Sequence, residues 1–330
     1  MNPFKTALKG RKKMNKPSGP SKTEVGKILS CIARYIFLTA FAYILLYPLL
    51  FIIANSLKGP ADYFDPTVEW VPKIVSFSNY SIAAGVMKFG KSLKNTLVIM
   101  IVSSVIEIFS CAFAAYGLAR FNFRGKRVLS VVMIITILVP SAMIMLPSYL
   151  NFRYTDLFGI LGFIGKLTGK ELRLNLLDTP FVFWIPSVFA VGLKGGLFIY
   201  IYSQFYKGLP KEFEEAAYID GAGPVRTYFS IILKASAVPM VTVSLFSVVW
   251  HWNEYYLSSL YLSNKPTLSV SLYTFADNIN AYYNGAASNT ILTGPAIMAG
   301  CVMFVLPMIA FYLVLQRKFV SSIANSGIVG

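Results

Sequence analysis

The feature that most constrains the fold of this chain is a series of mainly apolar stretches. A transmembrane helix needs about 20 consecutive apolar residues. The predicted spans cover residues 32–54, 93–117, 128–149, 180–206, 237–262 and 291–315. Hydrophobic residues make up 56% of the chain and charged residues 13%, whereas soluble domains carry about 25% charged residues. The sequence therefore predicts an all-α polytopic membrane protein with six transmembrane helices.

The formal net charge of +16 fits this topology by its distribution along the chain. Eight basic residues lie within residues 1–27, and most of the others flank apolar stretches. Lys and Arg gather on the cytoplasmic side of membrane proteins. We therefore expect a basic cytoplasmic tail over residues 1–27 that contacts anionic lipid, one membrane domain over residues 28–330, and both termini in the cytoplasm. The same distribution argues against nucleic acid as a partner.

We expect neither a metal site nor a nucleotide-binding site in this chain. The three cysteines are far apart, and His251 is the only histidine, so we expect no metal site. A phosphate-binding loop would read Gly-x-x-x-x-Gly-Lys-Ser/Thr. Two Gly-Lys pairs between the third and fourth predicted spans, Gly165-Lys166 and Gly169-Lys170, lack both the leading Gly and the following hydroxyl. We expect that the chain binds no ATP.

A polar passage at residues 209–233, LPKEFEEAAYIDGAGPVRTYFSIIL, interrupts the apolar second half. Residues 211–219 are good helix formers. Residues 220–223 are typical of a turn, and Pro224 suits the first position of a second helix. The passage predicts a helix, a tight turn and a second helix, with small side chains where another surface can approach closely.

This passage resembles the cytoplasmic coupling motif of ABC importer membrane subunits, which reads Glu-Ala-Ala, three residues, Gly, nine residues, Ile-x-Leu-Pro. The matching positions are Glu215, Ala216, Ala217, Gly221, Ile231 and Leu233. Asp220 and Ala222 also match the sugar-importer form, whereas Lys234 replaces the final Pro. Residues 115–121 (AYGLARF) and 315–320 (LQRKFV) also resemble that family. The chain thus resembles the binding-protein-dependent permeases of carbohydrate uptake, of the kind of the maltose transporter's second permease.

The resemblance implies a type I ABC importer permease with six helices and cytoplasmic coupling helices at residues 209–234, located in a bacterial cytoplasmic membrane. Such a subunit is not an enzyme, because ATP and Mg²⁺ are used by a partner ATPase dimer. The other implied partners are a second permease and an extracytoplasmic solute-binding protein. The residues implied to contact the ATPase are Glu214, Glu215, Ala216, Ala217, Asp220, Gly221 and Ala222.

Polar residues inside predicted spans are candidates for the solute path, because they are costly in a bilayer. Lys194, Trp250, Asn253 and Glu254 form this candidate set, and the Trp ring offers a stacking face for a sugar. Structural roles remain open for each of them, since Trp is common at membrane interfaces and polar side chains bond neighbouring helices.

Two other functions remain open. An ion- or proton-coupled secondary carrier would need a coupled acid, for which Glu107 and Lys194 are the candidates. It would also be expected to show inverted repeats, and the sequence shows none. An ABC importer for a non-sugar solute would have the same architecture. Pro140 and Pro147 predict a kink in the third span, and residues 150–179 form either an interfacial helix or a contact for a binding protein.

Overall fold

The computed structural model describes residues 22–156, 159–169, 173–282 and 293–326. Within these ranges the protein is helical. The described residues form no strand apart from two isolated bridges, which pair Lys58 with Val75 and Thr155 with Leu174. The predicted all-α fold is therefore confirmed. The chain divides into two compact units, residues 1–52 and 53–330, which are described separately.

The helices vary widely in length. They are α1 (Lys22–Ser56), α2 (Pro60–Phe64), α3 (Ser78–Val86), α4 (Phe89–Arg120), α5 (Lys126–Leu138), α6 (Ser141–Arg153), α7 (Ile160–Thr168), α8 (Phe181–Val188), α9 (Gly195–Gly208), α10 (Glu212–Ile219), α11 (Pro224–Thr227), the π-helical segment η2 (Tyr228–Ile232), α12 (Leu233–Ala235), α13 (Ala237–Asn253), α14 (Tyr256–Tyr261), α15 (Leu268–Tyr273), α16 (Phe275–Tyr282) and α17 (Thr293–Ser326).

The first unit consists mainly of α1, which begins at Lys22 and carries Pro48 inside it. The predicted span at residues 32–54 lies within this helix. The tail predicted over residues 1–27 differs from the structure at its end, because residues 22–27 form the first turns of α1. Residues 1–21 lie outside the described part of the chain.

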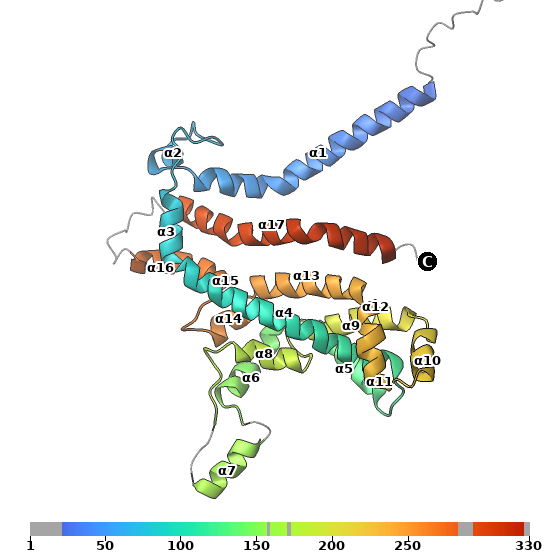
Figure 1. Ribbon diagram of the computed structural model, residues 1–330. Helices are drawn as coiled ribbons and strands as arrows, with labels where there is room; N and C mark the ends of the chain where they lie inside the picture. The colour runs from blue at the N-terminus through green and yellow to red at the C-terminus, as the bar shows by residue number, and fades with distance from the viewer. Residues whose placement is uncertain (1–21, 157–158, 170–172, 283–292, 327–330) are drawn as a thin grey trace, which may run out of the picture. The chain divides into compact units, whose positions relative to one another are not determined.

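Helix α4 is the central element of the second unit and packs against α8, α9 and α13 (Figure 1). Its buried side chains recur every three or four residues, as expected for one face of a helix. They include Thr96, Met100, Ser103, Ser104, Glu107, Cys111 and Ala115. Small side chains predominate on this face, which lets neighbouring helices approach closely.

Among the described residues, three helices are long and apolar enough to cross a membrane, and up to five if each bent pair is one span. The three are Leu29–Ser56, Phe89–Arg120 and Thr293–Val314. The bent pairs are α5 with α6, at 105°, and α11–α12 with α13, at 76°. The number of six spans therefore stays a prediction. The predicted kink in the third span is a sharp bend at Pro140, which ends α5 because proline cannot continue a helix.

Two predicted spans are wrong as continuous helices. The stretch 180–206 breaks between α8 and α9, where Ala190 and Lys194 adopt positive φ angles of 58° and 63°. Such angles are incompatible with a right-handed helix. The stretch 237–262 breaks after Asn253, because Glu254 is extended, with ψ of 109°.

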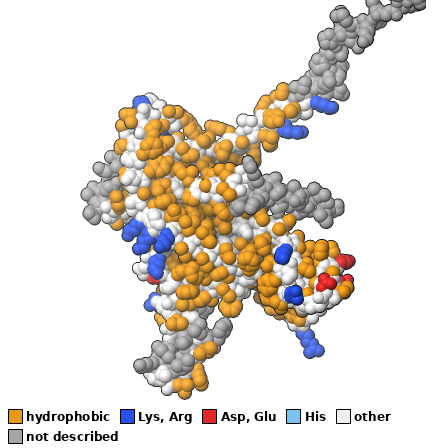
Figure 2. Space-filling model, in the orientation of Figure 1, with side chains coloured by type: hydrophobic (Ala, Val, Ile, Leu, Met, Phe, Trp, Pro, Cys, Tyr) orange, Lys and Arg blue, Asp and Glu red, His pale blue; other side chains and the backbone are white. Residues whose placement is uncertain are grey.

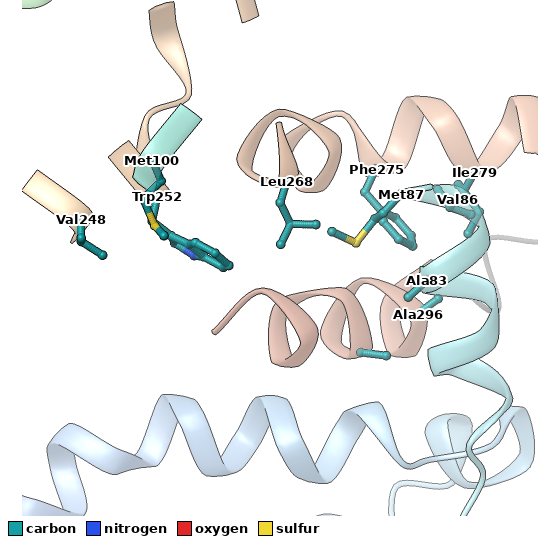
Figure 3. Packing of buried hydrophobic residues seen from close by; sticks show 11 residues of the cluster. Ala83, Val86, Met87, Met100, Val248, Trp252, Leu268, Phe275, Ile279 and Ala296 are labelled. Carbon is teal, nitrogen blue, oxygen red and sulfur yellow. The ribbon is translucent and has the colours of Figure 1, made fainter. Parts of the chain in front are cut away.

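A buried apolar cluster joins α3, α4, α13, α15, α16 and α17 (Figure 3). Trp252 lies in it with 1% of its surface exposed, and its ring centroid is 5.6 Å from that of Phe304. Hydrophobic side chains also cover most of the face shown in Figure 2. An apolar exterior of this extent is typical of helices that face lipid.

Candidate functional site

The residues that resemble the coupling motif form a helix–turn–helix, as the sequence predicts. The turn after α10 has the hydrogen bonds of a Schellman motif: the Ala222 N–H donates to the Ala217 carbonyl at 2.9 Å, and the Gly221 N–H to that of Tyr218 at 3.0 Å. Gly221 has φ of +76°, which a residue with a Cβ adopts only with strain. Pro224 begins α11, as predicted, but the regular second helix is short and continues as η2.

Helix α10 has one face against the protein and one face outward. Glu214 and Ala217 are buried, whereas Glu215 and Ala216 are exposed. The Glu214 carboxylate forms an ion pair with Arg120, with 3.1 Å between Oε1 and Nε. Arg120 also donates from Nη2 to the Leu209 carbonyl at 2.7 Å. These contacts hold α10 against the end of α4.

The outward side of these elements is unusually apolar for a polar passage. Ile219 is 86% exposed and Val225 63%, and Phe213 and Phe229 are each about half exposed. Acidic side chains lie beside them: Glu212, Glu215 and Asp220 are exposed. Figure 2 shows red acidic side chains close to hydrophobic ones in this region. Exposed apolar groups with a polar border are typical of a protein–protein contact surface.

A cluster of buried tyrosines lies beneath η2, and the sequence analysis missed it. The rings of Tyr116 on α4 and Tyr228 on η2 are 5.1 Å apart, and those of Tyr116 and Tyr206 on α9 are 5.9 Å apart. Tyr202 stacks on Tyr206 at 6.0 Å. The cluster connects η2 to α4 and α9. Its only signal in the sequence is the spacing of Tyr202 and Tyr206, which places them on one helix face.

Lys194 and Trp250 come together in the structure, although they are far apart in the sequence. The Lys194 ammonium lies 5.8 Å from the centre of the Trp250 ring, within the range of a cation–π contact. Lys194 is exposed and precedes α9, and Trp250 on α13 packs against Phe198 and Phe246.

Asn253 and Glu254 make local contacts instead. Asn253 is exposed and its Nδ2 donates to the Val249 carbonyl of its own helix at 2.8 Å. The Glu254 Oε1 accepts the Leu257 N–H at 2.7 Å, so this carboxylate binds the backbone at the start of α14. Asn253, Glu254 and Trp250 do not line the cavity described next, whereas Lys194 does.

A cavity of about 660 Å³ lies between the bent pair α5–α6 and the break that separates α8 from α9. Its lining is mainly apolar, and Lys194 is the only charged residue among the described lining residues. Thr136, Ser141 and Ser148 contribute hydroxyl groups. The broken helices therefore border this space with one cation at its edge.

Glu107, which the sequence analysis named as a candidate coupled acid, occupies a buried polar cluster. The Ser247 Oγ is 2.8 Å from Oε2 of Glu107, the Ser187 Oγ is 3.4 Å from Oε1, and the carboxyl group is fully buried. A Cβ on Gly192 would meet Oε1 of Glu107, and would lie 2.8 Å from the Ser187 Oγ. Gly192 therefore lets the broken segment approach α4.

The structure records no ion pair between Glu107 and Lys194 among the described residues. The closest basic group is His251, whose Nδ1 is 3.9 Å from Oε2 of Glu107. That nitrogen lies 2.9 Å from the Ser247 carbonyl oxygen and donates its proton there. Among the described residues, no group of three or more His, Cys, Asp or Glu side chains is arranged to hold a metal ion.

Comparisons with known proteins agree with this geometry. The family described as "binding-protein-dependent transport system inner membrane component" matches residues 108–325. A probable starch degradation products transport system permease protein of Thermoanaerobacterium thermosulfurigenes is 26% identical, over 84% of this chain and 89% of its own length. A trehalose transport system permease protein of Mycobacterium tuberculosis is 28% identical, over 86% of this chain and 93% of its own length.

The fold also has a counterpart among solved structures. A chain of a bacterial ABC transporter involved in the import of the acidic polysaccharide alginate superposes with a TM-score of 0.70, at 24% identity, over 91% of this chain and 99% of that chain. The architecture is therefore that of a type I ABC importer permease. The permease subunits of this family are non-enzymatic membrane components. The chain belongs to the family of binding-protein-dependent transport system inner membrane components and is a permease subunit of an ABC importer.

Proposed function

We propose that this subunit, paired with a second permease, forms the pathway by which a sugar or oligosaccharide enters a bacterial cell. An extracytoplasmic solute-binding protein delivers the sugar, and a cytoplasmic ATPase dimer that uses ATP and Mg²⁺ supplies the energy. The relatives support a sugar as the substrate: those described above are named for starch products and trehalose, and a third, from Bacillus subtilis, for melibiose, raffinose and stachyose. In this proposal the chain lies in the cytoplasmic membrane with both termini inside.

The observation that carries the proposal is the exposed face of α10. The opposite face of this helix contacts α4 through the ion pair of Glu214 with Arg120. Glu215, Ala216 and the exposed apolar groups contact the ATPase, and Glu214 contacts Arg120. Movement of the ATPase would then reach α4 through this ion pair and α9 through the tyrosines. Gly221 gives the turn its shape, and Asp220 and Ala222 flank it. Coupling of this kind shifts an equilibrium between two conformations and needs no chemical step in this chain.

On the membrane side, Lys194 and Trp250 are the residues that we assign to the sugar path. The indole ring offers an apolar face to a sugar ring, and the ammonium donates hydrogen bonds to hydroxyl groups. Lys194 lines the cavity beside the break before α9, and Trp250 contacts Lys194 from α13. The local contacts of Asn253 and Glu254 support a role in shaping the end of α13.

A purification of the importer in mild detergent tests the coupling surface. Ile219→Glu places a charge in the most exposed apolar position of the face. The wild type is expected to retain both the ATPase and the second permease, whereas Ile219→Glu loses the ATPase and keeps the permease. Val71→Glu is the matched control, because Val71 is 80% exposed in the loop between α2 and α3. Retention of the ATPase by Ile219→Glu would exclude this face.

Uptake into proteoliposomes tests the substrate class. The complete importer with its binding protein should accumulate a labelled disaccharide or oligosaccharide only when ATP is enclosed on the ATPase side, and a proton ionophore should have no effect. Selection of a peptide by the binding protein would exclude a sugar importer. Accumulation without ATP that an ionophore abolishes would exclude the ABC mechanism for this chain.

A further inference from the structure

Helix α7 (Ile160–Thr168) is an amphipathic helix to which the proposed function gives no role. Figure 1 shows it beyond α6, apart from α4, α9 and α13. Ile160, Phe163 and Leu167 follow the spacing i, i+3, i+7 and therefore share one face. They are 58%, 65% and 73% exposed. Three large apolar side chains thus form a stripe without cover from the described part of this chain.

The opposite side of α7 contacts Asp156, which lies between α6 and α7. The Gly162 N–H donates to the Asp156 carboxylate. A Cβ on Gly162 would lie 2.7 Å from an oxygen of that carboxylate, so a larger side chain there would displace Asp156. Lys166 is exposed at the border of the apolar stripe. One face of α7 is therefore held by Asp156, and the opposite apolar face is exposed.

Two backbone hydrogen bonds between Thr155 and Leu174 join the two ends of the segment that contains α7. The Thr155 N–H donates to the Leu174 carbonyl at 3.0 Å, and the Leu174 N–H to the Thr155 carbonyl at 3.1 Å. The Leu176 N–H then donates to the Phe152 carbonyl at 2.9 Å. Because the two ends of the segment are joined to each other, α7 stays close to the end of α6.

The end of α6 carries side chains that are typical of the membrane–water boundary. The Arg153 Nη1 donates to the Tyr149 hydroxyl at 3.0 Å, and the guanidinium lies 5.7 Å from the centre of the Tyr154 ring. Tyr side chains concentrate at the level of the lipid headgroups, and long cationic side chains reach the same level. Helix α7 begins only six residues after Tyr154, which places it near this boundary.

We propose that α7 lies in the headgroup layer of the bilayer, parallel to the membrane plane. Ile160, Phe163 and Leu167 enter the region between headgroups and acyl chains, and Lys166 and the exposed Arg173 face the phosphates of anionic lipids. An apolar face bordered by cations is the pattern of interfacial helices. Figure 1 shows α7 away from α10, so in this proposal α7 lies at the leaflet opposite the α10 side.

The depth of a spin label tests this proposal on the assembled importer in vesicles of phosphatidylcholine and phosphatidylglycerol. Phe163→Cys carries the nitroxide on the apolar stripe, and Thr168→Cys is the matched control on another side of the same helix. Cys31→Ser and Cys301→Ser remove the accessible native thiols, whereas Cys111 is buried and stays. Oxygen, which concentrates in lipid, should relax the label at position 163 several-fold more than a water-soluble nickel complex does. The order should reverse at position 168.

Two results would overturn the proposal. If nickel reaches both positions equally, α7 lies in water; if neither reagent reaches position 163, a protein partner covers the stripe. ATP-dependent uptake by each labelled importer shows that it is folded, and Leu167→Cys provides a second label on the stripe. For the charge contribution, Lys166→Glu should reduce the oxygen-to-nickel ratio at position 163 in vesicles with phosphatidylglycerol. An equal ratio with and without this substitution would exclude anionic lipid as the partner.

Discussion

Neighbouring side chains in the passage that resembles the coupling motif have different surroundings. Glu214 and Glu215 are adjacent in α10, yet one is buried against Arg120 and the other is exposed. A helix rotates by about 100° per residue, which follows from 3.6 residues per turn. The contacts of a side chain therefore depend more on its position around the helix than on its residue type.

We expect Glu214→Gln to lower the stability of the permease by about 2 kcal/mol, since a hydrogen-bonded charge loses its partner while Arg120 stays charged. Glu215→Gln removes an exposed charge and should change stability by less than about 0.5 kcal/mol, while it lowers sugar-stimulated ATP hydrolysis. Thermal unfolding in detergent and ATPase measurements on the complex separate the two effects. Equal melting temperatures for the two variants would show that Glu214 has no anchoring contact.

The loop between α2 and α3 contains an exposed ion pair between Lys73 and Asp65, and we expect the stability of this loop to depend on pH. Lys73 and the Thr67 hydroxyl and N–H hold the pKa of the Asp65 carboxyl well below its usual value. Because the folded pKa is depressed, the pair stabilises the loop above about pH 4, the pKa of a free Asp, and this contribution is lost as the pH falls through the folded value. Asp65 also raises the pKa of Lys73, so the pair stays complete through neutral pH.

Carboxyl resonances of ¹³C-labelled aspartate report this shift directly, and Asp65→Asn assigns the signal. Lys73→Met should return the pKa of Asp65 toward its usual value, although the Thr67 hydrogen bonds keep part of the depression. A titration of Asp65 that is the same with and without Lys73 would contradict the ion pair.

At the scale of the element, broken helices distinguish this fold from a bundle of simple spans. The breaks occur at Pro140, between Val188 and Gly195, and after Asn253. Proline and positive φ angles interrupt the backbone hydrogen bonds, and such interruptions are tolerated in membranes where protein or a cavity surrounds them. Two of the three breaks border the 660 Å³ cavity.

The turn after α10 offers a matched pair of glycine substitutions. Both Gly221 and Gly223 have open space around an added Cβ, but only Gly221 has positive φ. Gly221→Ala should therefore cost about 1–2 kcal/mol through backbone strain, and it should reduce the coupling of ATP hydrolysis to uptake. Gly223→Ala should cost less, because its φ of −75° suits any residue.

The measurement is the melting temperature of each variant together with the number of ATP molecules hydrolysed per sugar transported. If Gly223→Ala were the more damaging of the two, the shape of the turn would not explain the requirement for Gly221.

At the scale of the whole molecule, two tryptophans on α13 that are two residues apart belong to different parts of the protein. Trp252 fills the apolar cluster in Figure 3, which connects six helices of the second unit. Trp250 lies on the other side of α13, among Lys194, Phe198 and Phe246. One residue maintains the packing of the second unit, and the other lies beside the proposed path.

Trp252→Ala should therefore destabilise the protein by about 3–5 kcal/mol, the range for truncating a buried aromatic side chain. Trp250→Phe should leave the melting temperature nearly unchanged and lower uptake, since a smaller ring keeps the packing but weakens the contact with Lys194. Unfolding curves and initial uptake rates are the measurements. Wild-type uptake by Trp250→Phe would remove Trp250 from the path.

The sequence by itself determined the properties that depend on composition and local spacing. Long apolar runs predict membrane helices because the backbone must satisfy its own hydrogen bonds in lipid. The helix–turn–helix at residues 209–233 follows from helix formers, a glycine and a proline at fixed positions, which act within a few residues. The sequence does not predict that the second helix changes to the π-helical η2, where Tyr228 packs on Tyr116.

Only the tertiary structure decided which polar residues act together. Lys194 meets Trp250, and Glu107 meets Ser187 and Ser247, across 56, 80 and 140 positions of sequence. It also divided Glu214 from Glu215, and it showed that Asn253 and Glu254 bind nearby backbone groups at the end of α13. Such contacts depend on how helices pack, and side-chain spacing along one helix carries no information about its neighbours.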